Sequence, residues 1–442
     1  MFSKINKSKN SYIYAVVMSL ILLMATAFGV LIETEVGQIT RPTADTWDLY
    51  GVRPNTDEYD LIESPEGEFV SPWHIYTANE LAWLINNIKE QGWNEIYLEA
   101  DIDLAGHEWL PIEGNTTVST LFYGQGHTIR NLKINLPGNE TSVGLFKGCG
   151  TAQDVVFENV NIKGGNNTGA LCGVGTSSSY ANIQVKSGFI SGNNYVGGIV
   201  GYILAGTPKF INCFNNAVVN GNNSVGGILG FKRGVPVVSL ENCINTGNIV
   251  GIKNVGGLIG RVEQLGSIIG TGSTGPSIKN SYSETMVVGD NNVGGLIGST
   301  NVKASIQYSG FNGELVVNGA YQDTNLSVGL FIGNKISSSM LASFAVAKVF
   351  FTDESVTTQY DLYRMAGGTN SYVYADVSTL TSSQEVREYA EDTESTEYDL
   401  FAYDPNINGG FPFPRELFAV GKFIECGNII EYLQGFGFEA IY

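Results

Sequence analysis

The sequence predicts an all-β protein built around a parallel β-helix, or β-solenoid, of about seven coils. The first observation is a phrase of the form Val-Gly-Gly-apolar-apolar-Gly that recurs along the middle of the chain. Its close copies are Val196–Gly201, Val225–Gly230, Val255–Gly260 and Val293–Gly298, and its looser copies are Val143–Gly148, Thr168–Gly173 and Val328–Gly333. From the second residue of one phrase to that of the next, the steps are 25, 28, 29, 30, 38 and 35 residues. Such spacing is typical of a solenoid, in which each copy buries its apolar face against its neighbours.

The second observation concerns the segments between the phrases. Leu240–Gly251 and Ile211–Gly221 each contain short β-branched stretches separated by Asn or Gly. Asn and Gly tolerate left-handed backbone angles and mark corners, whereas Val, Ile and Leu mark half-buried strands. Three short strands and three corners per coil are expected. No helical periodicity interrupts residues 141 to 335, which argues against a doubly wound βαβ sheet.

The glycines of the phrase are predicted to be structural. We expect Gly256 and Gly257 to turn the chain inward where a side chain would collide with the adjacent coil, and Leu258 and Ile259 to point to opposite faces of a strand. The predicted repeat glycines are Gly144, Gly148, Gly169, Gly173, Gly197, Gly198, Gly201, Gly226, Gly227, Gly230, Gly256, Gly257, Gly260, Gly294, Gly295, Gly298, Gly329 and Gly333.

The phrase resembles the GLUG repeat of bacterial surface and secreted proteins, including regions of some immunoglobulin A1-specific metalloproteases. The blocks Ile96–Gly106 and Leu121–Leu132 are similar to the strands that precede such repeats, and Asp404–Pro412 resembles the closing segment of the same group. The resemblance covers roughly residues 71 to 415. It implies a β-solenoid fold, and it implies no particular activity, because members of the group share no single biochemical function.

The first residues predict export. Lys4, Lys7 and Lys9 precede an uncharged stretch from Asn10 to Ile32, and Ala25-Thr26-Ala27 offers small residues for a signal peptidase. The apolar run is also long enough to remain in the bilayer as an anchor. Residues 1–32 are therefore interpreted as a signal peptide or an N-terminal membrane anchor, and either alternative places the folded part outside the cytoplasm.

Composition agrees with an extracytoplasmic body. The formal charge is -19, so nucleic acid and an acidic bilayer surface would be repelled, and contact with a membrane is expected only through the N-terminal segment. The 55 glycines fit corners and tight stacking, since a hydrophobic content of 43% can still build a core.

The ends of the column are expected to carry caps. Residues 33–70 are interpreted as a linker, residues 71–140 as an N-terminal cap with the first strands, residues 141–345 as the repeats and residues 346–442 as a C-terminal cap. In the first cap, Thr77-Ala78-Asn79-Glu80 has the form of a capping box, and the apolar residues that follow have helical spacing as far as Gly92. A short helix is predicted near Ser382 to Tyr389 in the second cap.

The five cysteines are too few for a disulfide-built scaffold. Cys213 and Cys243 occupy the same repeat position and should stack in adjacent coils within disulfide range, or remain as two buried thiols; the second alternative is favoured. Cys149, Cys172 and Cys426 have no spacing that suggests a metal site.

Catalytic and metal sites are not predicted. His107-Glu108 begins like a zinc-protease helix, but Pro111 stands where the second histidine is required. A structural role is expected for His107 and for His127. Asp101 and Asp103 share one face of a strand, where a pair of carboxylates could bind Ca²⁺ or act in acid–base chemistry, although a structural role is favoured. No catalytic residue, metal or cofactor is assigned.

The repeat region offers few further candidates. Its acidic side chains are few and scattered, and no two recur at equivalent positions in adjacent coils closely enough to propose a catalytic pair. The main ones are Glu158, Glu241, Glu263, Glu284, Asp290, Glu314 and Asp323. Repeated corner asparagines, such as Asn212 and Asn242, are expected to satisfy backbone groups. Five tyrosines could present aromatic faces to carbohydrate, although packing is the commoner role: Tyr180, Tyr195, Tyr202, Tyr282 and Tyr308.

The leading hypothesis is an exported, secreted or cell-surface scaffold that binds an extracellular glycan or protein without catalysis. The alternatives are a polysaccharide-binding or polysaccharide-degrading β-helix protein and a structural stalk that displays a partner. A long groove lined by grouped charged residues would favour the polysaccharide-degrading alternative.

Overall fold

The fold was established from a computed structural model. It describes residues 51, 53, 62–63, 69–70, 72–88, 94–113, 120–138, 142–176, 179–203, 206–234, 238–264, 275–318, 327–335, 338–351, 370–379, 386–389, 401–402 and 413–414. The chain divides into residues 1–46 and residues 47–442, and every described residue belongs to the second unit. The predicted export segment, residues 1–32, lies outside the described residues.

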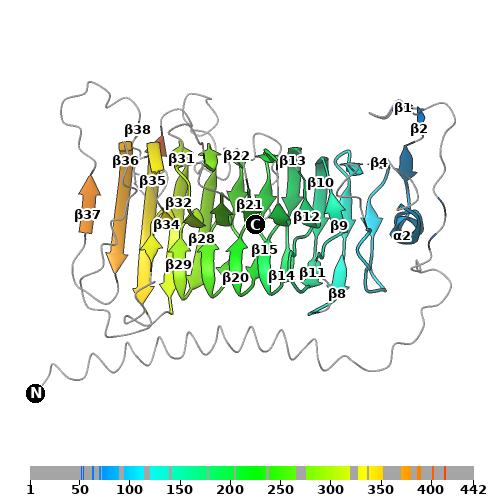
Figure 1. The fold of residues 1–442 in the computed structure, drawn as a ribbon, viewed down its shortest axis with the longest axis horizontal. Coiled ribbons are helices and arrows are strands. Elements are labelled where there is room, and N and C mark those ends of the chain that lie inside the picture. The colour runs from blue at the N-terminus through cyan, green and yellow to red at the C-terminus, as the bar shows by residue number, and fades with distance from the viewer. Residues whose placement is uncertain are drawn as a thin grey trace, which may run out of the picture. The chain divides into compact units, whose positions relative to one another are not determined.

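Short strands stacked side by side form the body of the second unit (Figure 1). The largest sheet of the described residues has 23 strands, nearly all paired in parallel. These strands are β3 (Trp73–Ile75), β4 (Asn94–Leu98), β5 (Ile102–Asp103), β6 (Thr120–Tyr123), β7 (Thr128–Arg130), β8 (Lys133–Asn135), β10 (Ala152–Glu158), β11 (Val160–Lys163), β13 (Ser179–Val185), β14 (Gly188–Ser191), β17 (Lys209–Ile211), β18 (Phe214–Asn215), β19 (Val218–Asn220), β22 (Ser239–Glu241), β23 (Ile244–Asn245), β24 (Ile249–Val250), β27 (Ser277–Lys279), β28 (Tyr282–Gly289), β31 (Ala304–Gln307), β32 (Gly310–Val317), β35 (Ser338–Phe351), β36 (Asn370–Thr379) and β37 (Val386–Tyr389).

Two further parallel sheets close each coil. A seven-stranded sheet contains β9 (Phe146–Cys149), β12 (Cys172–Gly175), β16 (Val200–Ile203), β21 (Leu229–Arg233), β26 (Ile259–Glu263), β30 (Ile297–Thr300) and β34 (Ile332–Lys335). A five-stranded sheet contains β15 (Asn194–Gly197), β20 (Asn223–Gly226), β25 (Lys253–Gly256), β29 (Asn291–Gly294) and β33 (Val328–Gly329). The prediction of a parallel β-solenoid of about seven coils is confirmed.

The recurring phrase sets the register of this stack. The valine of each close copy pairs with the valine of the next, from Val196 through Val225 and Val255 to Val293. The looser copies join the same column, because Val143 pairs with Thr168, Thr168 with Val196, and Val293 with Val328. Equivalent residues therefore lie one above another in all seven copies.

The paired glycines are required by the close approach of neighbouring coils. A Cβ atom on Gly257 would collide with the carbonyl oxygen of Gly295 in the next coil and with the side chain of Ser283. A Cβ atom on Gly256 would meet the backbone nitrogen of Gly298. The sequence-based expectation for these two glycines is therefore confirmed.

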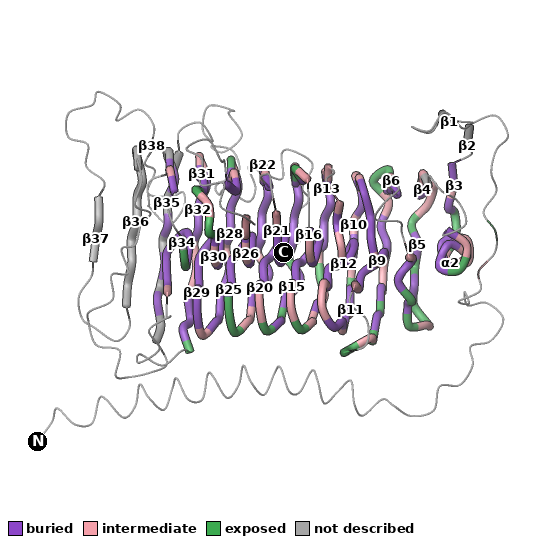
Figure 2. The backbone as a smooth tube through the Cα atoms, viewed as in Figure 1, coloured by how far each residue is buried: buried purple, intermediate pink, exposed green. Residues whose placement is uncertain are grey.

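Apolar residues fill the interior of every coil, as Figure 2 shows by the buried positions along the tube. Leu258 and Ile259 are both completely buried. The expectation that they point to opposite faces is wrong, because Leu258 lies in the corner between β25 and β26 and not within a strand. At such a corner two successive side chains can both reach the core.

Helix α2 (Ala78–Asn87) begins with the predicted capping box. The Glu80 amide donates to the Thr77 hydroxyl, and the Glu80 carboxylate accepts from the Thr77 amide. The helix lies beside β3, where Trp83 contacts Trp73 at a ring-centroid distance of 5.2 Å. In the described part of the chain, no helix is long and apolar enough to cross a membrane.

Strands extend into the two segments that were interpreted as linker and C-terminal cap. Strands β1 (Ile62–Glu63) and β2 (Phe69–Val70) pair antiparallel, as do β38 (Phe401–Ala402) and β39 (Phe413–Pro414). Strand β35 crosses position 345 and pairs in parallel with β36. The helix predicted near Ser382 is wrong for the described residues of that segment, because these residues form β37, which pairs antiparallel with β36.

The four described cysteines are buried free thiols. Cys213 and Cys243 lie at equivalent inward positions of adjacent coils, as predicted, and are completely buried. A second cysteine contact was not predicted: the sulfur atoms of Cys149 and Cys172 lie 2.6 Å apart. Burial raises the pKa of the Cys149 and Cys243 thiols well above its ordinary value, so both remain protonated and unreactive.

Candidate functional site

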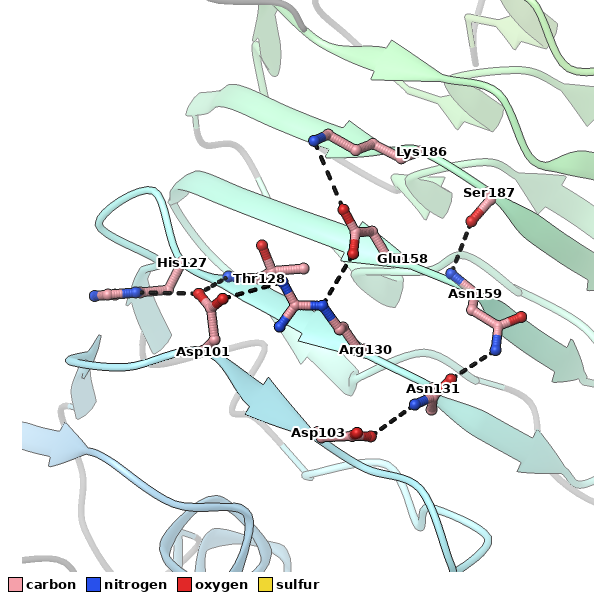
Figure 3. A network of polar contacts seen from close by, with 10 residues as sticks. All are labelled: Asp101, Asp103, His127, Thr128, Arg130, Asn131, Glu158, Asn159, Lys186 and Ser187. Carbon is pink, nitrogen blue, oxygen red and sulfur yellow. Dashed lines mark hydrogen bonds and ion pairs between the residues drawn. The ribbon is translucent and has the colours of Figure 1, made fainter. Parts of the chain in front are cut away.

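A ladder of alternating charges crosses the outer surface of the first coils (Figure 3). Its members are Asp101, Arg130, Glu158 and Lys186, which we call the charge ladder. Arg130 is the last residue of β7 and pairs in register with Glu158 at the end of β10, whereas Asp101 immediately precedes β5. Parallel pairing of these coils brings together residues that lie 28 or 29 positions apart in the sequence.

The contacts of the charge ladder alternate in sign. Arg130 Nη2 lies 3.1 Å from Asp101 Oδ2, and Arg130 Nε donates to Glu158 Oε2 at 3.0 Å. Lys186 Nζ lies 3.6 Å from Glu158 Oε1. Each carboxylate therefore faces at least one cation of a neighbouring coil.

Asp101 has two further contacts that favour its ionised form. The backbone N–H of Thr128 donates to its Oδ1 at 3.0 Å, and His127 Nδ1 lies 3.3 Å from the same oxygen. The Thr128 hydrogen bond is the main cause that lowers the pKa of Asp101, with Arg130 and His127 adding to it. The pKa of Arg130 is raised in turn by its hydrogen bond to Asp101. Asp101 is thus an acceptor and an anion, and it is poorly suited to donate a proton near neutral pH.

A row of amides runs beside the charge ladder. Asn131 Nδ2 donates to Asp103 Oδ1 at 2.7 Å, and Asn159 Nδ2 donates to Asn131 Oδ1 at 2.6 Å. The backbone N–H of Asn159 donates to Ser187 Oγ at 2.9 Å. Asp101 and Asp103 therefore belong to one surface network, as their spacing predicted. Each carboxylate already accepts a hydrogen bond from the protein, Asp101 from the Thr128 N–H and Asp103 from the Asn131 side chain.

The three histidines have structural neighbours. His127 follows the turn at Gly126 and contacts Asp101, as expected for a corner residue. His74 Nδ1 lies 2.6 Å from Glu99 Oε1, and its ring stacks on Tyr97. The segment around His107 is a turn followed by extended chain, so the helical zinc-protease motif that proline argued against is not formed.

Metal binding finds no support in the described residues. Among them, no group of three or more His, Cys, Asp or Glu side chains is arranged to hold an ion. Two carboxyl groups of the repeats have a raised pKa because they are partly desolvated, Glu284 on β28 and Asp290 after it. In the next coil Glu284 faces Asn312, an amide and not a second carboxylate.

Corner asparagines form ladders along the column. Asn242 Nδ2 donates to Asn212 Oδ1 at 3.0 Å, and Asn212 Nδ2 donates to Asn182 Oδ1 at 2.9 Å. Asn182 continues the row to Asp154. These side chains were expected to satisfy backbone groups; instead they bond to one another, while their left-handed backbone angles make the corner.

The five candidate tyrosines separate into three groups. Tyr180 and Tyr282 are buried in the coils, which matches the packing role. Tyr195 and Tyr202 are half-buried and stack on each other with ring centroids 5.4 Å apart. Tyr308 occupies a corner with a left-handed backbone. The aromatic surface available to a ligand in this set is therefore concentrated at Tyr195 and Tyr202.

Sequence reasoning missed two features of this surface. The partners of the charge ladder are separated by a whole coil, so only the register of neighbouring strands reveals them.

Lys232 is completely buried, and its Nζ donates to the carbonyl oxygen of Arg233 at 2.7 Å. Desolvation lowers the pKa of Lys232 to about 8. The signal for Lys232 was its position in β21, where the register aligns it with Ile203 and Val262 of the neighbouring coils.

Comparisons with known proteins give limited matches. No protein-family model matches the chain, so membership of the GLUG group stays a prediction. A stretch of 147 residues is 33% identical to halomucin of Haloquadratum walsbyi, which is 30% of this chain and 2% of halomucin. A solved structure from Bacteroides ovatus, whose proposed identity is an immunoglobulin A1 protease, superposes with a TM-score of 0.45 at 19% identity, covering 81% of this chain and 99% of that one. The chain thus spans about 2% of the length of its curated relative, and a TM-score of that size carries no functional argument.

Proposed function

We propose that this chain is a secreted or cell-surface β-solenoid that acts as a non-catalytic interaction scaffold for an extracellular glycan or protein. The observation that carries the proposal is the separation between residues that build the coils and residues that face outward. The stack depends on the glycines of the phrase and on buried aliphatic side chains, so the outward positions are free to carry ligand-binding chemistry.

The seven-stranded sheet illustrates this separation. One inward position reads Phe146, Cys172, Val200, Leu229, Ile259, Ile297 and Ile332 in successive coils, all of them buried. The outward position two residues further on reads Gly148, Val174, Tyr202, Phe231, Arg261, Ser299 and Asn334. Apolar, aromatic, charged and polar residues follow one another there without disturbing the register.

The location outside the cytoplasm rests on two weaker supports. Residues 1–32 have the sequence pattern of an export signal or an anchor. The similarity to a stretch of halomucin, a protein whose name describes a mucin, agrees with a surface or secreted protein. Fractionation of the native cells, with detection of the chain before and after protease treatment of intact cells, tests this part of the proposal.

The binding part is tested on the purified chain without residues 1–32. We expect it to bind at least one class of polymer on a broad array of glycans and extracellular proteins, and to lose binding when it is heat-denatured. Circular dichroism run in parallel establishes that the sample is folded. A folded sample that binds nothing on either array would contradict the scaffold function.

A catalytic alternative is favoured by one observation, the grouping of Asp101, His127, Arg130 and Glu158 on one surface. A β-helix enzyme that acts on acidic polysaccharides would release reducing ends or unsaturated products, and Asp101→Asn would abolish that release. The scaffold proposal predicts no product from polygalacturonate, alginate or hyaluronate after prolonged incubation. Release that disappears in the variant would replace the scaffold by an enzyme.

A further inference from the structure

An aromatic and basic surface forms on three consecutive coils of the repeats, and we call it the aromatic patch. It consists of Tyr195, Tyr202, Phe231, Arg233 and Arg261. Phe231 is nearly buried beneath the others, with its ring 4.8 Å from that of Tyr195 and 5.5 Å from that of Tyr202. The guanidinium carbon of Arg261 lies 5.4 Å from the Phe231 ring centroid. Arg233 is exposed, and its positive charge offsets part of the desolvation that raises the pKa of the Tyr202 hydroxyl.

The backbone at Tyr195 indicates that this surface is not needed by the fold. Tyr195 has a φ of 59°, in the left-handed region that the equivalent corners of later coils fill with Ser224, Asn254 and Asn292. Asn and Ser suit such corners, whereas a bulky side chain there is strained. Asn292 and Asn254 also join a ladder of side-chain amides that a tyrosine cannot extend in the same way. Strain that the fold does not require is a reason to look for a ligand.

Local charge sets the kind of ligand. The patch holds Arg233 and Arg261, with buried Lys232 beneath it, against the single carboxylate of Glu263, whose Oε2 lies 3.2 Å from Arg261 Nη2. Residues 141–335 as a whole contain more basic than acidic side chains, although the full chain has a formal charge of -19. The acidic excess therefore lies outside the repeats, and the patch is locally cationic.

These features together indicate which class of ligand suits the aromatic patch. Half-buried tyrosine rings offer flat apolar surface with a polar edge, which suits a ligand that is apolar on one face and hydroxylated at its rim. A guanidinium group matches a planar carboxylate through two parallel hydrogen bonds. A carboxylated sugar carries both features in one unit, and a polymer of such sugars can lie along the outer face of parallel strands.

We propose that the aromatic patch is the binding site for a uronic-acid unit of an acidic polysaccharide. The proposal rests on the scaffold function proposed above and specifies its ligand class. Tyr195 and Tyr202 contact the sugar ring, Arg233 pairs with its carboxylate, and Arg261 holds the aromatic floor from the neighbouring coil.

The test uses coil-matched variants of the chain without residues 1–32. Tyr202→Val introduces the residue found at the same position of the preceding coil, and Arg233→Gln removes the exposed cation while keeping its polar character. Lys209→Gln removes an exposed cation outside the patch and serves as the matched control. Binding to polygalacturonate, alginate and hyaluronate is measured by affinity electrophoresis and calorimetry, with dextran as the neutral arm and dextran sulfate as the sulfated arm.

We expect binding to at least one carboxylated polymer but not to dextran. Each patch variant should weaken binding about tenfold, since a charge-assisted hydrogen bond or an aromatic contact contributes that much. Lys209→Gln should change binding less than about twofold. Unchanged unfolding midpoints establish that all variants are folded; if Tyr202→Val is destabilised, Arg233→Gln decides alone.

The outcomes separate this proposal from the scaffold function. Binding to uronic-acid polymers that both patch variants retain would place the glycan elsewhere, overturning the patch and leaving the scaffold intact. Binding to dextran sulfate alone would overturn the carboxylate assignment. A folded chain that binds proteins but no acidic glycan would also overturn it, whereas a chain that binds no partner at all contradicts the scaffold function itself.

Discussion

The first coils and the repeat coils join their neighbours by different chemistry. In the first coils, unlike charges face each other across adjacent strands, as in the pairs Arg130–Asp101 and Arg130–Glu158. In the repeat coils, identical amides face each other, as in Asn242 and Asn212, and glycines allow the backbones to approach. Both arrangements hold the same parallel register.

The difference follows from what repetition permits. A repeated charge would stand opposite a like charge in the next coil, which is destabilising, whereas a repeated amide can donate to and accept from its own copy. A repeating sequence therefore selects Asn for its outer ladders. Where the outward residues of neighbouring coils differ, as at Arg130 and Glu158, acid and base can alternate instead, beside the amide contact of Asn159 with Asn131.

The largest expected effect concerns the glycines of the recurring phrase. Gly257→Val should lower the free energy of unfolding by about 3 kcal/mol, because the new side chain meets Gly295 and Ser283 in a packed interior. Urea unfolding followed by circular dichroism measures the change. Ser239→Val adds similar bulk at an outward position of β22 and should stay within about 0.5 kcal/mol. Equal tolerance of both substitutions would contradict the stacking argument.

The next effect concerns Lys232, a buried basic residue of the repeat coils. The pKa of Lys232 is lowered from 10.5 to about 8 by desolvation, so between these values the unfolded chain binds more protons than the folded one. Stability should therefore rise with pH across that interval, and the full cost of the buried ammonium is present below pH 8. Lys232→Met should then stabilise the protein by roughly 2–3 kcal/mol at pH 7, with the gain shrinking toward pH 10.5.

Urea unfolding of wild type and variant at both pH values measures this gain. Lys253→Met, at an exposed position of β25, is the control and should be neutral at either pH. A gain that does not depend on pH would mean that Lys232 acts through packing and not through its charge.

These two sites also mark how far the sequence could predict the fold. The spacing of the phrase predicted parallel coils, and Gly257 could be assigned because a recurring glycine at a corner implies close approach. Lys232 could not be assigned. In a straight strand Lys232, three residues after Leu229, would lie on the opposite face, yet both side chains are buried.

The candidate sites were predicted less completely than the fold. Tyr195 and Tyr202 were named as aromatic candidates, and Asp101 and Asp103 were placed on one face, because both inferences need only local spacing. The partners Arg130 and Glu158 were missed, since register between coils is set by loops of variable length. The meeting of Cys149 and Cys172 was missed for the same reason: their positions are offset in the register, Cys172 facing Phe146.

A smaller effect separates the two kinds of ladder by their response to salt. Glu158→Gln removes the ion pairs to Arg130 and Lys186 and should cost about 1 kcal/mol at low ionic strength but little in about 1 M salt. Asn242→Gly keeps the left-handed corner and loses the amide bond to Asn212, which should cost about 1 kcal/mol at either salt concentration. Urea unfolding in low and high salt measures both. The same salt response in both variants would remove the distinction between the two regions.

The smallest effect concerns Asp101, where the charge ladder begins. Its pKa is lowered in the folded state, chiefly by the Thr128 N–H, from an ordinary value of 3.8. A lowered folded pKa means that the stabilisation is present above pH 3.8 and is lost as the pH falls through the lower folded value. Asp101→Asn should therefore be less stable than wild type at about pH 6, and the difference should shrink as the pH falls through the lowered folded pKa of Asp101. Arg130 and His127 remain in place in this variant. If the stability difference between variant and wild type persisted undiminished in acid, the Asp101 side chain would act through its shape and its hydrogen bond with the Thr128 N–H. The charge ladder would then have no electrostatic role at this end of the column.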